Sequence, residues 1–226
     1  MDKKITLQQA MDLINDGDTL LVGGFGLSGT PLSLLDEIAK SEKKNLTVVS
    51  NNLGEEDKGV GKLLTNGNLK KAIGSYFTTN RDAVKAWKQG KLELELIPQG
   101  TLAEAIRCGG AGIGGFYTKT AVGTSLAEGK ELKEIDGEVY VFEKAIKGDV
   151  AIIKASKADR LGNLIYHKTA RNFNPLMATA ADIVIAEVDE IVESGTFSPE
   201  SIVTPHLYVD YIVLNKYRKI AGRYVL

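Results

Sequence analysis

Apolar residues in this chain form short continuous runs that alternate with stretches of helical periodicity. Continuous apolar runs bounded by polar residues or glycine are typical of strands that a sheet buries on both faces. They predict strands at 19–23, 45–50, 69–76, 150–155, 164–167 and 182–188. Apolar residues at helical spacing predict helices at 6–15, 31–40, 58–65, 80–89, 102–108 and 174–181. Because a strand, a helix and a second strand follow one another within 19–50, we expect a parallel sheet built from βαβ units.

The middle of the chain departs from this pattern. Residues 92–97 alternate between aliphatic residues and glutamate, which predicts a strand with one buried and one solvent-exposed face. Residues 139–142 predict a strand that forms a hairpin with residues near 131–135, and residues 202–213 predict a strand or an extended tail. We therefore predict a single α/β domain over residues 1–226. It should have an open, mainly parallel sheet flanked by helices, with a mixed or antiparallel middle section.

Composition narrows the class of protein. The 226 residues carry a net charge of −1, so charge favours neither nucleic acid nor a membrane surface as a partner. No apolar run approaches the roughly 18 residues of a membrane span, and the N-terminal residues do not form the apolar core of a signal peptide. The single cysteine, Cys108, suits a reducing compartment. These features predict a cytoplasmic protein.

A glycine-rich loop follows the first predicted strand. Gly24, Gly26 and Gly29 lie between that strand and the helix at 31–40. Thr30 is a suitable N-cap for this helix, and Pro31 suits its first turn, where a missing N–H has no cost. Backbone N–H groups at a loop of this kind form a concave surface that favours negative charge. We therefore expect the loop to contribute to a binding site.

The glycines of this loop also satisfy the spacing of a dinucleotide-binding fingerprint. That fingerprint requires an acidic residue at the end of the second strand, where this chain has Ser50-Asn51-Asn52. The missing acid disfavours a dinucleotide, and the loop also lacks the Gly-Lys-Ser/Thr ending of a P-loop. A tight turn that binds nothing is the structural alternative.

Several segments resemble one enzyme family in the same order along the chain. Residues 16–31 match its signature of an acidic or amide residue, glycine, an apolar run, Gly-Gly-Phe, and later glycine and proline. The resemblance continues through Ser50-Asn51-Asn52, 98–102, Arg107 with 109–112, and 160–164. The chain thus resembles the class I CoA-transferase family, in particular the A (alpha) subunits of 3-oxoacid, acetate and butyrate–acetoacetate CoA-transferases. It departs from the family at Ser28, where many members have cysteine, and at Thr30, where an apolar residue is common.

The resemblance implies an enzyme that transfers CoA by covalent ping-pong catalysis. In the family, a glutamate attacks an acyl-CoA thioester and becomes a glutamyl-CoA thioester. That glutamate belongs to a Ser-Glu-Asn-Gly motif of the B (beta) subunit, and this chain contains no such motif; its Glu193-Ser194-Gly195 is different. The resemblance therefore implies a non-nucleophile subunit in an A2B2 assembly. Its co-substrates would be a CoA thioester and a short acid, acetoacetate with acetate, butyrate or succinate, with no bound cofactor or metal.

Candidate site residues follow from this chemistry. A carboxylate substrate that develops oxyanions requires neutral hydrogen-bond donors, and Gln99 supplies an amide at the end of a predicted strand. In the family, the matching glutamine lies near the reacting carbonyl, and positions matching Asn51 and Asn52 line the substrate pocket. The alternatives are that the asparagines cap a turn and that Gln99 fixes a loop.

The glycine-rich segments complete the candidate site. Glycine permits close approach of the backbone to a ligand or partner, so the set includes five residues that could line the pocket: Gly24, Phe25, Gly26, Gly29 and Gly110. Phe116 is a candidate apolar wall, and Arg160, Gly162 and Asn163 match a family motif that we interpret as a structural hairpin. A sugar-phosphate or small-anion binding regulatory module of related fold is the alternative function.

Overall fold

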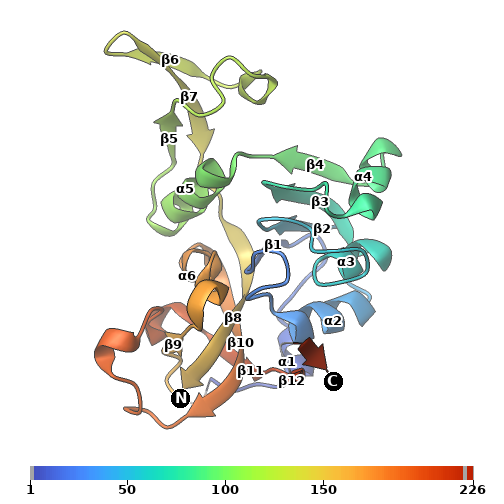
Figure 1. Cartoon of the computed structure of the whole chain (residues 1–226), viewed down its shortest axis with the longest axis vertical. Coiled ribbons are helices and arrows are strands. Elements are labelled where there is room, and N and C mark those ends of the chain that lie inside the picture. The colour runs from blue at the N-terminus through green and yellow to red at the C-terminus, as the bar shows by residue number, and fades with distance from the viewer. Residues whose placement is uncertain (1–2, 221–222, 226) are drawn as a thin grey trace.

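A computed structural model describes residues 3–220 and 223–225 of the chain. Within them, the main sheet has eight strands in the order β11-β10-β8-β1-β2-β3-β4, with β9 paired to β8 (Figure 1). All of its pairings are parallel except the antiparallel pair of β8 and β9. The strands of this sheet are β1 (Thr19–Val22), β2 (Leu46–Val49), β3 (Leu69–Gly74), β4 (Glu93–Leu96), β8 (Gly148–Asp159), β9 (Leu164–Ile165), β10 (Ala181–Val192) and β11 (Tyr211–Leu214). The predicted fold class is confirmed.

Helices cover both faces of the sheet. One face carries α1 (Leu7–Met11), α2 (Leu32–Lys40), α3 (Gly61–Thr65) and α4 (Arg81–Lys88), and the other carries α5 (Gln99–Gly110) and α6 (Asn174–Met177) (Figure 1). Strand β1 shows why its sequence is continuously apolar: Leu20 and Val22 pack in the core of the first face, whereas Leu21 packs in the core of the second. The longest described helix, α5, has 12 residues, so no helix of the described chain could cross a bilayer.

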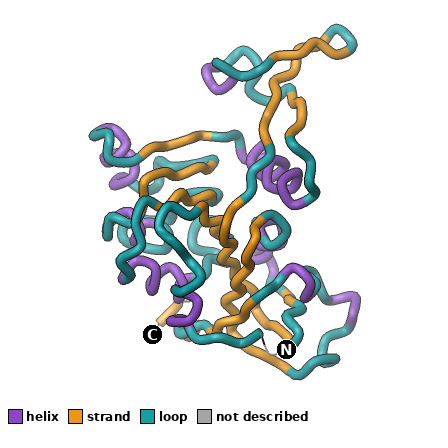
Figure 2. Tube along the Cα trace, turned by 180° about the vertical axis from the view of Figure 1, so that it is seen from behind, coloured by secondary structure: helices purple, strands orange, loops and turns teal. Residues whose placement is uncertain are grey.

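A small antiparallel sheet projects from the main body, as Figures 1 and 2 show. It consists of β5 (Gly115–Thr118), β6 (Leu132–Ile135) and β7 (Glu138–Lys144) in the order β5-β7-β6. The predicted hairpin and the antiparallel middle section are therefore confirmed. The remaining elements are β12 (Arg218–Ile220), β13 (Arg223–Val225), η1 (Ser125–Ala127), η2 (Lys168–Arg171), η3 (Pro199–Ser201) and η4 (His206–Tyr208).

The turn between β8 and β9 confirms the predicted structural hairpin. Asp159 is buried, and its Oδ1 accepts hydrogen bonds from the backbone N–H groups of residues 161–163, at 2.9–3.0 Å. Its Oδ2 accepts a hydrogen bond from Asn163 Nδ2 at 2.8 Å. This one carboxylate thus satisfies the donors of the whole turn.

Several expectations about individual elements were wrong. The alternating segment at 92–97 lies at the edge of the sheet, so Leu96 is 47% exposed and β4 has no buried face. Helix α1 ends at Met11 and α6 ends at Met177, because their periodic sequences continue into turns. The tail at 202–213 contains a strand only from Tyr211 onward.

Candidate functional site

The carboxyl ends of four parallel strands meet at one edge of the main sheet. Strands β1, β2, β3 and β4 are neighbours in that order, and their ladders continue past the strands. Ser75 N donates to Asn51 O at 3.0 Å, and Ile97 N donates to Gly74 O at 2.9 Å. The glycine loop follows β1, the Asn51-Asn52 pair follows β2, and Gln99 follows β4, so the fold brings these predicted residues to one edge. In open parallel sheets, ligands bind at this edge.

The Phe25–Ser28 segment forms the tip of the glycine loop. Phe25 N donates to Ser28 O at 3.0 Å and Ser28 N donates to Phe25 O at 3.1 Å, so the tip is a closed tight turn. The Phe25 side chain is 51% exposed. Gly24 has a φ of +125°, and a Cβ there would lie 2.1 Å from Thr30 Oγ1, so only glycine fits. The loop is thus shaped by its own chain.

Two further glycines of this loop have nearly the same backbone conformation but different surroundings. Gly26 and Gly29 have φ of +62° and +66°. A Cβ at Gly26 would have no atom within 4 Å, whereas a Cβ at Gly29 would lie 2.2 Å from Ala170 O. Gly26 therefore leaves open space at the tip of the loop, and Gly29 packs on the chain itself.

These two positions give a matched test of the packing. We expect Gly26→Ala to lower the free energy of unfolding by about 1–2 kcal/mol through its left-handed φ alone. Gly29→Ala should lower it by about 1–3 kcal/mol more, because the backbone at Ala170 must also move. Urea denaturation of both variants measures the difference. Equal losses would show that the approach of residue 170 does not constrain the loop.

The N-terminus of α2 is not the anion site that the sequence suggests. Thr30 does not cap the helix: the N-cap position is Pro31, and Thr30 Oγ1 instead donates to Gly26 O at 3.2 Å. The Glu187 carboxylate of β10 accepts hydrogen bonds from Ser33 N at 2.8 Å and Leu34 N at 3.1 Å. Because this fully buried carboxylate already uses the free N–H groups of the first turn, an external anion cannot bind there.

Glu187 is held in an unusual electrostatic environment. Burial raises the pKa of its carboxyl to about 7, although Lys154 and the N–H groups of Ser33 and Leu34 act in the opposite direction. Its second oxygen, Oε1, is buried without a hydrogen-bond partner. Lys154 is its neighbour on β8, and the Lys154 Nζ is paired with Asp189 at 2.6 Å. The carboxylate therefore lacks a direct ion pair that would offset its burial.

The Glu187 pKa predicts how stability depends on pH. Its folded-state value of about 7 lies above the ordinary 4.5, so folding favours the protonated form. That contribution is complete below about pH 4.5 and is lost as the pH rises through 7. Between pH 5 and 8, we expect the wild-type chain to lose about 2–3 kcal/mol more stability than Glu187→Gln. Urea denaturation measures this loss, with the exposed Glu200→Gln as a control. Parallel pH profiles for wild type and Glu187→Gln would contradict the prediction.

The two asparagines at the end of β2 are tied to neighbouring turns. Asn51 is 2% exposed, and its Nδ2 donates to Ser75 Oγ at 2.9 Å. Asn52 Oδ1 accepts a hydrogen bond from Gly54 N at 3.0 Å, as in an Asx turn. Gln99 differs from both, because its side chain is exposed at the first position of α5. It starts this helix and does not end a strand, and its amide is the more accessible donor.

The structure separates the last two predicted residues. Phe116 lines a cavity of 310 Å³ beside the first turn of α5, together with Gly100 and Thr101. Gly110 lies at the other end of α5, about 18 Å along the helix from Gln99. A Cβ at Gly110 would lie 2.2 Å from Thr179 Oγ1, so packing accounts for this glycine.

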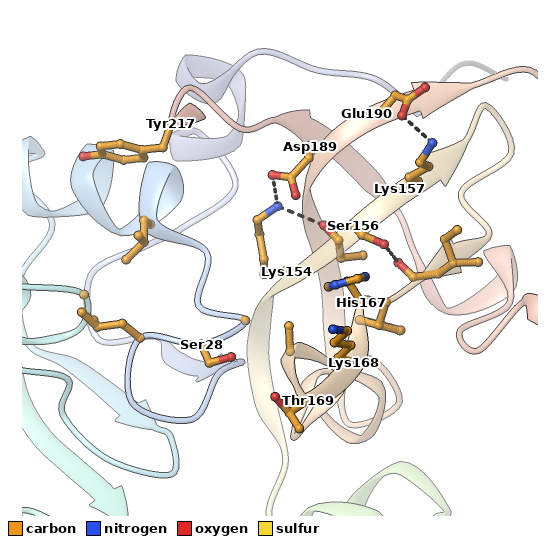
Figure 3. Close-up of a pocket in the computed structure, with 18 of the residues that line it drawn as sticks. Ser28, Lys154, Ser156, Lys157, His167, Lys168, Thr169, Asp189, Glu190 and Tyr217 are labelled. Carbon is orange, nitrogen blue, oxygen red and sulfur yellow. Dashed lines mark hydrogen bonds and ion pairs between the residues drawn. The ribbon is translucent and has the colours of Figure 1, made fainter. Parts of the chain in front are cut away.

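A larger cleft was not predicted from the sequence. It has a volume of 1220 Å³ and lies between the glycine loop, α2 and α3 on one side and β8, β9 and η2 on the other (Figure 3). Charged side chains line it, including the ion pairs of Lys154 with Asp189 and Lys157 with Glu190, both at 2.6 Å. Of the predicted residues, only Gly29 reaches it. The one available signal was Lys154 within the otherwise apolar run at 150–155. Within the described residues, no group of acidic, histidine or cysteine side chains could hold a metal ion.

Comparison with known proteins decides the family. The family model for coenzyme A transferase matches residues 4–215. The chain belongs to the coenzyme A transferase family. It is 57% identical, over 92% of its length and 87% of the relative, to the A chain component of the probable succinyl-CoA:3-ketoacid coenzyme A transferase of Bacillus subtilis. It is 44% identical, over 96% of its length and 99% of the relative, to the alpha subunit of acetate CoA-transferase from Escherichia coli K12.

Solved structures show the same fold. The acyl-CoA transferase of Escherichia coli O157:H7, crystallised as a thioester complex with CoA, superimposes with a TM-score of 0.87 at 23% identity over 98% of this chain. This chain spans about half the length of that protein, 50% of its chain. Glutaconate CoA-transferase from Acidaminococcus fermentans gives a TM-score of 0.84 at 23% identity, over 94% of this chain and 75% of that one. The family match confirms the resemblance and favours an enzyme over the sugar-phosphate or small-anion binding module.

Proposed function

We propose that this coenzyme A transferase chain is the A (alpha) subunit of an enzyme that moves CoA between a short-chain acyl-CoA and a free carboxylic acid. The observation that carries the proposal is the placement of an exposed neutral amide, Gln99, at the same sheet edge as the glycine loop and Asn51-Asn52. Relatives that match more than nine-tenths of the chain are named as A or alpha subunits, and the chain contains no Ser-Glu-Asn-Gly segment.

In the proposed reaction, the nucleophile is a glutamate of the B subunit. Its carboxylate oxygen attacks the thioester carbonyl, the CoA thiolate leaves, and an acyl-glutamyl anhydride forms. The thiolate then attacks the glutamyl carbonyl, releases the first acid as a carboxylate and leaves a glutamyl-CoA thioester. A second carboxylate reverses these steps and leaves as the new acyl-CoA. CoA is thus a co-substrate, and no metal or prosthetic group takes part.

This chain supplies neutral hydrogen-bond donors in that scheme. The Gln99 amide donates to the carbonyl oxygen as negative charge develops on it, which lowers the barrier more than it stabilises the bound substrate. Hydrogen bonding to Ser75 orients the Asn51 amide, and Asn52, Gly24, Phe25, Gly26 and Gly29 complete the wall for the acid. Phe116 forms an apolar wall beside the first turn of α5. Gly110 is not part of this proposed wall, because it lies at the far end of α5.

The assembly we propose is a cytoplasmic A2B2 heterotetramer in which residues 1–226 form one domain. The acids are acetoacetate together with acetate, butyrate or succinate. The test is an assay of CoA transfer from acetoacetyl-CoA to each of the other three acids by the chain combined with its B subunit. Transfer to at least one acid supports the proposal, and a complex that uses none of them contradicts it.

A further inference from the structure

Two asparagines of one short segment support the glycine loop from below. Asn172 and Asn174 lie between η2 and α6, more than 140 positions from the loop in sequence. Asn172 Nδ2 donates to Ser28 O at 3.0 Å. Asn174 is fully buried, and its Nδ2 donates to Gly29 O at 3.0 Å. Consecutive carbonyls of the loop are therefore held by neighbouring amides.

Asn174 also connects the loop to the central strand β8. Its Oδ1 accepts a hydrogen bond from the Lys154 backbone N–H at 2.8 Å. Its Nδ2 also lies 3.0 Å from Ala170 O, the atom that leaves no room for a Cβ at Gly29. A Cβ at Gly23 would lie only 1.9 Å from Asn174 Oδ1. The loop and the segment thus fit at backbone distance, with Asn174 at the contact between them.

The backbone at Asn172 is also unusual. Its φ of 22° and ψ of −121° fall outside the common regions for a residue with a side chain. Its own Oδ1 accepts a hydrogen bond from Phe173 N at 2.7 Å. Such a conformation persists only where the surroundings fix it, and here it is what lets the Asn172 amide reach Ser28 O.

We propose that Asn172 and Asn174 are positioning residues that fix the Ser28 and Gly29 carbonyls and thereby hold the Phe25–Ser28 tip at the sheet edge. The tip is the part of the loop with an exposed aromatic side chain and with open space at Gly26. The consequence for catalysis rests on the proposed function, because a displacement of about 1 Å at a reacting centre can cost roughly 10²-fold in rate.

Asn68 provides a matched control. It is also fully buried, and its Nδ2 donates to the backbone carbonyls of Lys43 at 2.8 Å and Ile38 at 3.3 Å. It contacts neither the glycine loop nor the Asn172–Asn174 segment in any of these bonds. Asn68→Asp and Asn174→Asp therefore remove equivalent buried donors, and only the second change affects the loop. Asn172→Ala is a milder variant, because it removes the bond to Ser28 at a partly exposed side chain.

The first measurement is amide hydrogen exchange of Phe25 and Ser28 in the chain. We expect at least about tenfold faster exchange in Asn172→Ala and Asn174→Asp, since both amides form the turn at the tip. Exchange there should stay at the wild-type rate in Asn68→Asp. Wild-type exchange in Asn172→Ala and in Asn174→Asp would overturn the proposal, and Asn172→Ala decides if Asn174→Asp does not fold.

The second measurement is CoA transfer by the assembled enzyme. At equal folded fraction, we expect kcat to fall about tenfold or more in Asn172→Ala and Asn174→Asp, with KM within about twofold of wild type. Asn68→Asp should keep the wild-type kcat. An equal loss in Asn68→Asp would overturn the positioning role, as would wild-type kcat in both loop variants. A wild-type complex without CoA transfer would contradict the proposed function alone, and hydrogen exchange would then decide the positioning.

Discussion

The purified chain by itself should transfer CoA at least about 10⁴-fold more slowly than the chain assembled with a B subunit that carries Ser-Glu-Asn-Gly. Loss of a covalent nucleophile typically costs roughly 10⁴–10⁶-fold in rate. The glutamates near the end of β10 are poor substitutes. Glu187 is fully buried and bound to the first turn of α2, and Glu193 is paired with Arg160 at 2.8 Å.

This expectation is checked with the separate and the mixed polypeptides. Steady-state assays compare the mixture with the chain alone and with the isolated B subunit. Mass spectrometry after incubation with acyl-CoA then identifies the polypeptide that carries the CoA adduct. We expect activity only in the mixture, with the adduct on the B subunit. An adduct on this chain, or full activity without a partner, would refute the assignment as the non-nucleophile subunit.

Replacement of Gln99 by alanine should lower kcat of the assembled enzyme by about 10²–10³-fold, the typical cost of losing one oxyanion donor. The Gln99 side chain is exposed at the start of α5, so the folded state should be little affected, within about 0.5 kcal/mol. The loss should therefore appear in kcat at an unchanged melting temperature.

Gln89→Ala is the matched control for this variant. Gln89 is also exposed, and it lies at the C-terminal end of α4 instead of the carboxyl edge of the sheet. Its variant should keep wild-type kcat and KM. If Gln99→Ala also leaves kcat/KM unchanged, Gln99 does not contact the reacting carbonyl and the proposed site must be redrawn around other donors.

The sequence predicted the architecture well because local patterns carry it. The continuous apolar run at Leu20–Val22 requires burial on both faces, which only a sheet covered on both sides supplies. Residues 92–97 mark the limit of such reasoning. Their alternation predicts a half-buried strand, yet β4 is an edge strand whose Leu96 remains 47% exposed. Period alone does not specify a strand's place in the sheet.

The candidate site shows the same division. Gln99, Asn51 and the glycine loop follow successive strands, so the common direction of a parallel sheet was sufficient to predict that they meet at one edge. The charged cleft was not predicted, because its walls come from segments that are distant in sequence. Lys154 in an apolar strand was a signal for it only in hindsight, since its partner Asp189 belongs to another strand.

By itself, the sequence determined the family, the parallel sheet and the position of the glycine loop, because these depend on residue order and on local periodicity. Only the tertiary structure decided what the loop faces. Gly29 packs on Ala170, and Glu187 fills the helix N-terminus that was expected to bind an anion. The physical reason is that backbone donors and glycine hydrogens are satisfied by whichever group the fold brings within contact. Here those groups come from positions more than 130 residues away.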